Sequence, residues 1–394
     1  MGFMYSGGGE RTAIYEHLLL EKKGHHVECF APTVRTDLCH PDLIEQVKPT
    51  GFLPKVKVPL PLRDFLSLAS SSFLASFYAD KFAEFDVILC HGQPSTWIGY
   101  CVAEVVKKPY VCYLHQPARF LYPRAIDLEV GWGTKRDFAL LNTLVKAAKP
   151  LVKAWDHVSV ASADAVLVNS KWICNSVKRI YGCKPRVCPP GVDTQRYRPA
   201  VSPREKLTVN NKTVRKPFVL STNRHYPQKG LTYLIRMMPK ILQKCDVNLV
   251  ITSSFTRHTP KLRKLVENLK LQSNVVFTGQ VSETDLVKLY QNADVYAYSS
   301  PCEDFGLGPI EAMACGTPAV VWDYAGPTET VIDGTTGFRA KPYSIDDFSD
   351  KVIRLLTNGE LNRKMGAKVA EFVKKNFSWN KHVEALESVL EGVV

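Results

Sequence analysis

One stretch of this sequence combines a strand end, a glycine-rich loop and a helix start with two carboxylates. An apolar run that ends near Ser300 is followed by EDFGLGPIE, residues 303–311, and then by AMACGTP. Glu303 and Glu311 bracket the loop, and its glycines let backbone N–H groups approach a ligand. A helix N-terminus favours phosphate, whereas carboxylate oxygens accept hydrogen bonds from sugar hydroxyls. The loop therefore predicts a site for a ligand that is part diphosphate and part polyol.

The residues around this loop carry a long family resemblance. The pattern Glu-x7-Glu with an internal Phe-Gly-Leu is flanked by EAMACGTPAVV and AGPTETVIDGTTGF. It resembles the signature of retaining glycosyltransferases of family 4 (glycosyl transferases group 1). The resemblance covers essentially the whole chain and implies the GT-B fold, an α/β architecture of two Rossmann-like doubly wound domains facing across a cleft. The pair of glutamates taken alone would more often belong to an ordinary loop before a buried helix.

Length and composition agree with a two-domain globular protein. The chain has 394 residues, of which 45% are hydrophobic and 23% charged. Its eleven cysteines form no C-x-x-C pair, which disfavours a metal site or disulfide framework and favours a reducing cytosol. The sequence shows neither an apolar run of roughly 18 residues nor a signal sequence. We therefore expect a cytoplasmic protein.

The formal net charge of +13 indicates an anionic partner or a basic surface. No helix-turn-helix, zinc-finger or RNP pattern is visible in the sequence, so we expect no nucleic acid partner. A solvated basic face and attraction to an anionic membrane surface stay open as alternatives. The basic, aromatic-bearing stretch over 48–85 fits either a core helix with a surface loop or a segment on the cytoplasmic face of a membrane.

Strand and helix patterns divide the chain into four parts. Residues 1–198 predict an N-terminal Rossmann-like domain, and residues 217–376 predict a C-terminal Rossmann-like domain. The resemblance implies that the first lies on the acceptor side and that the second holds the nucleotide-sugar donor. Residues 199–216, which are proline-bounded and basic, predict an exposed linker or insertion. Residues 377–394 contain a last helix that, by the resemblance, packs back on the first domain.

The start of the chain predicts a short strand, a glycine turn over 6–11 and a helix, followed by a second strand over 27–31. The turn reads GGGER and not G-x-G-x-x-G, which disfavours an NAD-binding dehydrogenase. The resemblance implies that the amides of Gly8 and Gly9 face the donor phosphate.

A histidine ends the strand predicted over 109–114. His115-Gln-Pro117 is similar to the family's H-x-P element, whose histidine lies beside the donor sugar and its anomeric carbon. Ligands meet the carboxyl ends of strands in open α/β sheets, which favours a functional His115 over one satisfied by backbone carbonyls. His91 also ends a strand but has no matching motif.

The second domain carries cations on its first strand-to-helix turn. Arg224 and Lys229, five residues apart, match the family's R-x(4–5)-K-G element and can grip a diphosphate. Alone they would more often be surface charges. By the resemblance, Gln280 and Val281 lie where the backbone holds the nucleobase.

The resemblance implies a role for each of these groups. Arg224 and Lys229 neutralise the leaving diphosphate, aided by backbone N–H groups of Phe305, Gly306 and Leu307. Glu311 holds the ribose hydroxyls, Glu303 holds the sugar hydroxyls, and His115 orients the sugar and stabilises an oxocarbenium-like transition state. We expect no metal ion and no cofactor, because no D-x-D pattern is present and the two cations take that role.

The substrates are less constrained than the fold. The stretches HQPARFLY and EDFG resemble mannosyltransferases that use GDP-mannose, with UDP-glucose and UDP-N-acetylglucosamine as alternatives. The expected reaction is transfer of a hexose from a nucleoside diphosphate sugar to a hydroxyl of a lipid-linked or glycan acceptor. The competing class is a non-catalytic nucleotide-sugar binder, which could lose the carboxylates that this chain keeps.

Overall fold

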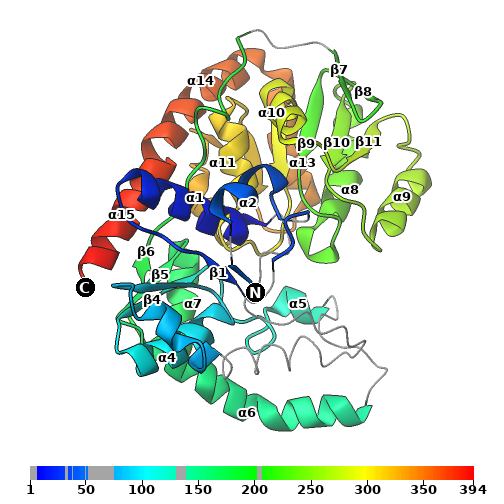
Figure 1. Ribbon diagram of the computed structural model, residues 1–394. Coiled ribbons are helices and arrows are strands. Elements are labelled where there is room, and N and C mark those ends of the chain that lie inside the picture. Colours follow the sequence, from blue (N-terminus) through cyan, green and yellow to red (C-terminus); the bar gives the residue numbers. More distant parts are fainter. Residues whose placement is uncertain are drawn as a thin grey trace. The chain divides into compact units, whose positions relative to one another are not determined.

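The computed structural model describes residues 7–31, 34–37, 39–48, 50–51, 75–129, 139–201 and 206–394 (Figure 1). The chain divides into two compact units. Unit 1 comprises Met1–Gly191 and Trp379–Val394, and unit 2 comprises Val192–Ser378. Each unit has a parallel sheet connected by helices, which confirms the predicted α/β class with two Rossmann-like domains.

Unit 1 is built on a four-stranded parallel sheet in the order β3-β4-β5-β6, with a separate parallel pair β1-β2. Strand β4 reads YVCYL and is buried along its whole length, as expected where helices cover both faces of a parallel sheet. The residues that follow these four strands therefore lie at one edge. The strands are β1 (Phe30–Ala31), β2 (Thr50–Gly51), β3 (Ile88–His91), β4 (Tyr110–Leu114), β5 (Ala165–Val168) and β6 (Arg186–Val187).

The helices of unit 1 include the last helix of the chain. Helix α15 packs on α1, and the ring of Trp379 stacks on Tyr15 with centroids 4.6 Å apart. The described helices are α1 (Gly8–Lys22), α2 (Pro41–Val47), η1 (Ala79–Phe82), α4 (Ser95–Val106), α5 (Ala125–Glu129), α6 (Ala139–Ala161), α7 (Lys171–Tyr181) and α15 (Trp379–Glu391).

Unit 2 has a six-stranded parallel sheet in the order β11-β10-β9-β12-β13-β14. The chain moves outward from β9 to β11, returns to β12 beside β9, and then moves outward the other way. This places a topological switch point between β9 and β12. The strands are β9 (Phe218–Ser221), β10 (Asn248–Thr252), β11 (Val275–Gly279), β12 (Val295–Tyr298), β13 (Ala319–Trp322) and β14 (Gly337–Ala340).

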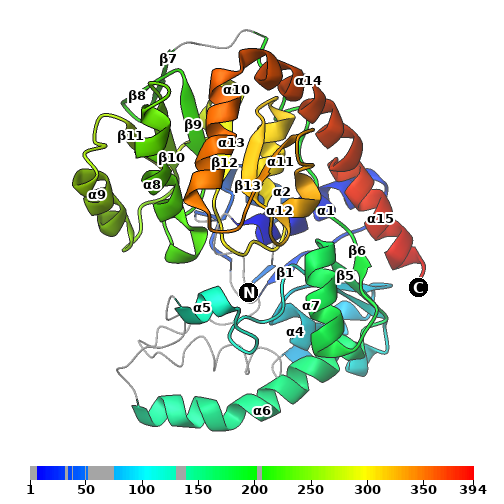
Figure 2. The same cartoon turned by 180° about the vertical axis from the view of Figure 1, so that it is seen from behind.

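Helices flank this sheet, as Figure 2 shows from behind. Helix α8 contacts α9 and α13, while α11 contacts α10, α12 and α14. The helices are η2 (Pro227–Lys229), α8 (Leu231–Leu242), α9 (Thr259–Asn268), α10 (Glu283–Asn292), α11 (Leu307–Ala314), α12 (Pro327–Thr330), α13 (Ile345–Thr357) and α14 (Gly359–Asn376). The segment expected as a linker or insertion, 199–216, carries the antiparallel hairpin β7 (Lys206–Val209) and β8 (Lys212–Arg215) of unit 2.

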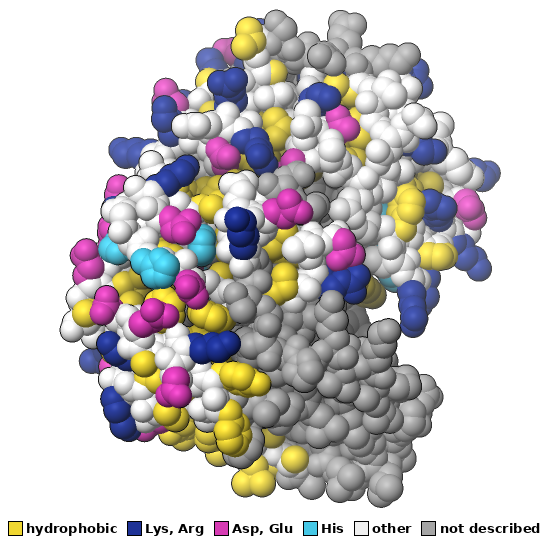
Figure 3. Space-filling model, in the orientation of Figure 1, with side chains coloured by type: hydrophobic (Ala, Val, Ile, Leu, Met, Phe, Trp, Pro, Cys, Tyr) yellow, Lys and Arg dark blue, Asp and Glu magenta, His cyan; other side chains and the backbone are white. Residues whose placement is uncertain are grey.

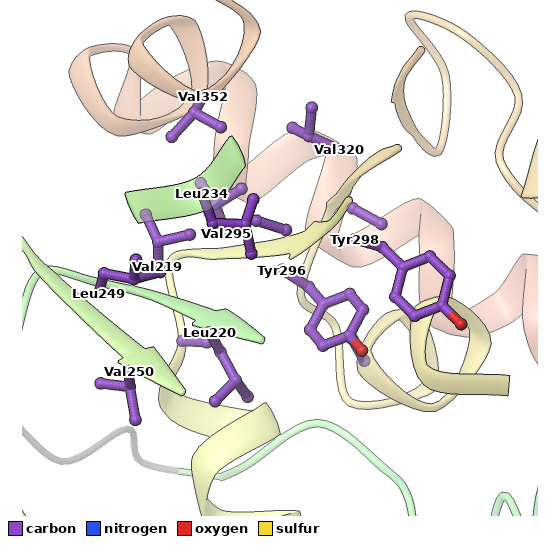
Figure 4. Packing of buried hydrophobic residues seen from close by; sticks show 14 of the residues in the cluster. Val219, Leu220, Leu234, Leu249, Val250, Val295, Tyr296, Tyr298, Val320 and Val352 are labelled. Carbon is purple, nitrogen blue, oxygen red and sulfur yellow. The ribbon is translucent and has the colours of Figure 1, made fainter. Parts of the chain in front are cut away.

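The core of unit 2 follows from central strands that are apolar along most of their length. Val219 pairs with Val295, and the next residues Leu220 and Tyr296 pair with each other. Because side chains alternate along a strand, the first pair points to one face and the second pair to the other (Figure 4). Both faces are buried in one hydrophobic cluster, so the sheet is a rigid base for the loops that follow its strands.

Two expectations for the start of the chain are wrong. The glycine segment expected as a turn over 6–11 belongs mostly to α1, which begins at Gly8. The helix extends into the glycines because its buried face packs in unit 1, and tertiary packing overrides low helix propensity. The strand expected over 27–31 contains only the two residues of β1, because the ladder with β2 begins at Phe30. The strand expected near Phe3 and most of 48–85 lie outside the described residues.

Two features are relevant to membrane association, namely the distribution of basic side chains on the surface and the length of the apolar helices. On the face in Figure 3, lysine and arginine side chains are spread over the described surface with acidic side chains among them, and do not form one basic patch. None of the described helices is long and apolar enough to cross a bilayer.

Candidate active site

The loops that follow β9 and β12 flank the switch point of unit 2 and carry two of the predicted site residues. Lys229 ends the turn η2 after β9, and Glu303 lies in the loop after β12. The Lys229 Nζ donates to Glu303 Oε2 at 2.5 Å, and these side chains are 24% and 16% exposed. Ligands of doubly wound sheets bind at such a point. The structure thus brings a cation and a carboxylate of the predicted donor site into direct contact.

The approach of these two loops depends on Gly230. Its φ is +65°, and a Cβ built there would lie 2.3 Å from the carbonyl oxygen of Ser299. The Ser299 hydroxyl donates to the Gly230 carbonyl at 3.0 Å, and the indole N–H of Trp322 donates to the Ser299 carbonyl at 2.9 Å. A side chain at position 230 would separate the loops, so Gly230 permits the contact between Lys229 and Glu303.

The N-terminus of α11 lies directly after this loop. Helix α11 begins at Leu307, and Gly306 precedes it with φ +92° and no side-chain cap. Phe305 is buried in the unit 2 core, and the N–H of Gly326 donates to the Glu303 carbonyl at 2.9 Å, which anchors the loop. The exposed amides of a helix start carry partial positive charge. This is a backbone arrangement suited to a phosphate.

Glu311, on the next turn of α11, has a different environment from Glu303. It is buried, and the Tyr290 hydroxyl donates to its Oε2 at 2.9 Å. Thr222, which follows β9, lies 3.1 Å from the Tyr290 hydroxyl and 2.8 Å from that of Tyr296. Burial, and then the charge of Glu311, hold the pKa of Tyr290 well above its usual value, so this hydroxyl keeps its proton. The network fixes the position of the Glu311 carboxylate.

Arg224 lies on the same turn as Lys229 but is exposed. Among the described residues, no side chain forms a hydrogen bond or ion pair with its guanidinium. Its neighbour His225 is buried, with Nδ1 3.0 Å from the Thr259 hydroxyl, and burial lowers the pKa of His225 to about 4. The structure therefore does not bring Arg224 to Glu303, and it gives His225 a neutral ring in the interior.

Gln280 and Val281 follow β11, which is separated from β9 by β10. The Ser254 hydroxyl donates to Gln280 Oε1 at 2.6 Å, and the Asn210 amide at the β7–β8 turn donates to the Gln280 carbonyl at 2.6 Å. Val281 packs half-buried against the core. These residues lie at the same edge of the sheet as Lys229, but among the hydrogen bonds and ion pairs of the described residues none joins them to Lys229.

In unit 1 the structure brings Gly9 against His115. A Cβ built on Gly9 would lie 3.1 Å from Cδ2 and 3.4 Å from Nε2 of His115. The carbonyl of His115 accepts a hydrogen bond from the Asn169 side chain at 3.1 Å. Burial of the ring is the main cause that lowers the pKa of His115 to about 3, so the ring is neutral near pH 7. Gly8 is exposed at the helix start.

Two residues near His115 were not among those predicted from the sequence, namely Glu16 of α1 and His382 of α15. Glu16 contacts both His91 and His382, and His91 in turn lies next to His115. One signal could have found them, because each is an ionisable residue at a buried position of an amphipathic helix. Among the described residues, no group of three or more His, Cys, Asp or Glu side chains is placed to hold a metal ion.

Comparisons with known proteins identify the class first. A sucrose-phosphate synthase from Thermosynechococcus elongatus has the same fold, with a TM-score of 0.77, 21% identity and coverage of 100% of this chain and 95% of that one. The Anabaena protein HepE in complex with UDP and glucose follows with a TM-score of 0.72, 18% identity and coverage of 98% and 96%. The fold is therefore GT-B, as predicted.

The family follows from sequence matches. Glycosyltransferase Family 4 matches residues 6–196, and Glycosyl transferases group 1 matches residues 204–372. The chain belongs to this family of glycosyltransferases, which confirms the resemblance.

Two relatives carry the name of a mannosyltransferase. A GDP-mannose-dependent monoacylated alpha-(1-6)-phosphatidylinositol monomannoside mannosyltransferase of Corynebacterium glutamicum is 29% identical over 84% of this chain and 93% of its own. A GDP-mannose-dependent alpha-(1-6)-phosphatidylinositol monomannoside mannosyltransferase of Mycobacterium tuberculosis is 30% identical over 52% of this chain. In that second match the chain spans 55% of the relative's length.

Proposed function

We propose that this protein transfers mannose from GDP-mannose to a hydroxyl of a lipid-linked or glycan acceptor, with retention at the anomeric carbon and without a metal ion. The relatives named for GDP-mannose and for phosphatidylinositol mannoside acceptors support the donor and the acceptor class. A nucleotide-sugar donor is further supported by the GT-B neighbour that holds UDP and glucose.

The observation that carries the proposal is the contact between Lys229 and Glu303 at the switch point of unit 2. A sugar nucleotide needs cations at its diphosphate and acceptors at its sugar hydroxyls. Lys229 supplies the first and Glu303 the second, beside the N-terminus of α11. A site for free phosphate alone would not be expected to pair its lysine with a carboxylate.

Other residues complete the donor site in this proposal. The exposed guanidinium of Arg224 binds the diphosphate next to Lys229, and the backbone from Phe305 to Leu307 adds N–H donors. Glu311, fixed by Tyr290, accepts from the ribose hydroxyls. The backbone at Gln280 and Val281 contacts the nucleobase, the amides of Gly8 and Gly9 face the phosphate, and His115 contacts the sugar.

The proposed reaction requires that the charge on the leaving group be stabilised. As the glycosidic bond to GDP breaks, negative charge develops on the diphosphate, and Arg224 and Lys229 offset it. By family analogy the acceptor hydroxyl attacks from the leaving-group face, with the diphosphate oxygen as its base, which retains the anomeric configuration. Because two side-chain cations take the part of a divalent ion, we expect activity in EDTA.

The donor is tested by thermal unfolding of the purified protein with GDP, UDP, ADP and their sugar conjugates, with and without EDTA. GDP-mannose at about 100 times its Kd should raise the stability by about 2.7 kcal/mol. Stabilisation by GDP compounds alone supports GDP-mannose. Stabilisation by UDP compounds would mean that the donor is a UDP-sugar, while the reaction class stays the same. Stabilisation by NAD alone would reject the proposal.

Catalysis is tested with the variants Arg224→Ala, Lys229→Ala and Glu303→Ala. Each should lower kcat/KM for transfer roughly 100- to 1,000-fold, because each removes a group that stabilises the transition state. Lys264→Ala, an exposed lysine on α9, is the matched control and should leave the rate unchanged. Variants that bind donor but show no transfer, together with an inactive wild type, would indicate a binding protein instead.

A further inference from the structure

Next to His115, unit 1 contains a network of hydrogen bonds and ion-pair contacts that the proposed function does not use. His91 ends β3 and His115 follows β4, so the parallel sheet places both at one edge. Glu16 comes from α1 and His382 from α15, two helices that pack on each other. The network is unusual because a carboxylate with 2% of its side chain exposed contacts two imidazoles.

The contacts of His382 fix its charge. Its Nε2 lies 2.8 Å from Glu16 Oε1, and its Nδ1 lies 2.8 Å from the carbonyl oxygen of Pro189. Carboxylate and carbonyl oxygens only accept hydrogen bonds, so both ring nitrogens carry protons and the ring is an imidazolium. Burial by itself would lower the pKa of His382, but hydrogen bonds with Cys188 and Glu16 raise it to about 10. Glu16 and His382 therefore form a buried ion pair.

Glu16 also determines which nitrogen of His91 carries the proton. His91 Nε2 lies 2.7 Å from Glu16 Oε2, the distance of an ion pair, although the angles are not those of a hydrogen bond. Two bare acceptors at this distance would repel each other, so we infer that Nε2 is the protonated nitrogen. The charge of Glu16 is already balanced by His382, and a second imidazolium would leave an uncompensated positive charge in the interior. In the tautomer with Nε2 protonated, the lone pair of His91 Nδ1 is the acceptor that lies 3.4 Å from Nε2 of His115.

We propose that His91 is a positioning residue for His115: oriented by Glu16, it accepts the Nε2 proton of His115 and leaves Nδ1 of His115 as a hydrogen-bond acceptor. The proposal depends on the proposed function only for the role of His115 at the donor sugar. A bare Nδ1 accepts the proton of a sugar hydroxyl and cannot donate one. His115 then binds a hydroxyl of the sugar by accepting its hydrogen bond. The tautomer of His115 depends on α15, because His382 of that helix pairs with Glu16, which orients His91.

The other groups that face His91 and His115 are consistent with this assignment of the ring protons. The Tyr113 ring lies 5.4 Å from that of His91 and 4.7 Å from that of His115, and its hydroxyl donates to the Cys188 carbonyl at 2.5 Å. Burial, and then Cys188 and Glu16, raise the pKa of Tyr113 well above its usual value, so it stays neutral. Asn169 contacts only the backbone of His115 among the hydrogen bonds of the described residues.

The tautomer can be measured by NMR of the whole protein labelled with 15N-histidine at pH 8, with His115 assigned through His115→Asn. We expect a protonated Nε2 and a bare Nδ1 on His115. His91→Asn offers an amide oxygen in place of Nδ1 and should keep this tautomer. His91→Lys can only donate, so it should move the proton of His115 to Nδ1. A protonated Nδ1 on His115 in the wild type would overturn the proposal, even if the lysine variant does not fold.

The same variants are tested in transfer kinetics with GDP-mannose. His91→Lys should lower kcat roughly 10- to 100-fold, the size of effect found when the partner that orients a metal-ligating histidine is lost, with KM for the donor within about twofold. His91→Asn should stay near the wild-type rate. His26→Asn, an exposed histidine outside the network, is the control for both measurements.

These results separate the inference from the proposed function. If the wild type transfers no sugar from any nucleotide sugar, the proposed function is wrong, while the tautomer of His115 still decides the inference. If transfer occurs and His91→Lys retains both the wild-type rate and the wild-type tautomer, only the inference is wrong.

Discussion

At the scale of single residues, two side chains of the same type can have different roles because their surroundings differ. Glu303 and Glu311 belong to one loop and helix start, yet Glu303 pairs with a partly exposed lysine, whereas Glu311 is buried against a tyrosine hydroxyl. A paired carboxylate can exchange partners when a ligand arrives, but a buried one with a fixed hydroxyl keeps its orientation. The two carboxylates therefore suit different parts of one donor.

Tyr290→Phe tests the fixed carboxylate. Removing the hydroxyl that donates to Glu311 deletes a hydrogen bond to a charged group, worth about 1.5–3 kcal/mol. If Glu311 binds the ribose, the Kd for GDP should rise roughly tenfold or more, because every 1.4 kcal/mol is a factor of ten. Calorimetric titration with GDP measures this, since GDP lacks the sugar that Glu303 binds. Tyr233→Phe, whose ring packs in the same unit, is the control, and equal Kd values in both variants would contradict the role of Glu311.

His382→Gln tests the buried ion pair through the pH dependence of stability. The pKa of His382 is raised from 6.5 to about 10, so its contribution is full below pH 6.5 and is lost as pH rises towards 10. Burial by itself would raise the pKa of Glu16, but His91 and His382 lower it from 4.5 to about 2, so its contribution is lost as pH falls from 4.5 to 2. The variant should lose about 3–5 kcal/mol of unfolding free energy, most of all between pH 4.5 and 6.5.

Urea unfolding of both proteins from pH 3 to pH 10 measures that difference. His25→Gln is the matched control, because His25 contacts Glu387 at an exposed position and should change stability by less than about 1 kcal/mol. A difference between wild type and His382→Gln that is constant across this range would show that the two groups do not form an ion pair.

At the scale of elements, the turn from β9 to α8 illustrates how one glycine sets the distance between two loops. Gly230→Ala would place a methyl group 2.3 Å from the Ser299 carbonyl at a left-handed φ. We expect a loss of more than about 1 kcal/mol in unfolding free energy, with weaker donor binding because Lys229 and Glu303 separate. Gly359→Ala at the start of α14 is the control, because a Cβ there meets no atom within 4 Å, and it should be neutral or stabilising. Equal melting temperatures for the two variants would contradict the close approach.

At the scale of the whole molecule, the chain enters unit 1 twice. Helix α15 supplies Val383, Leu386 and Val389 to a core cluster shared with β4 and β5, although it follows the last residue of unit 2 in sequence. A chain ending at Ser378 should therefore lose protection from hydrogen exchange in α1 and β4, and keep it in β9 and β12. Mass spectrometry of exchanged peptides measures this, and loss of protection confined to unit 2 would contradict the division of the chain.

The pattern of residues predicted the order of elements well. The apolar runs before Thr222, Ser299 and His115 are strands of parallel sheets, and the glycine and cation motifs follow them as expected. This works because a strand covered on both faces is apolar throughout and because turns need particular backbone conformations. The glycines at the chain start were harder, since packing of α1 and not local propensity decides that they are helical.

By itself, then, the sequence determined the α/β class, the family and the loops that carry charge, because each of these depends on residues close together in the chain. Only the tertiary structure decided which charges meet. Lys229 and Glu303 are 74 positions apart and Glu16 and His382 are 366 apart. Their contacts depend on the strand order that places β9 beside β12 and on the packing of α15 against α1. Local sequence patterns do not encode these contacts, because the contacts form only when elements that are far apart in the chain pack in one core.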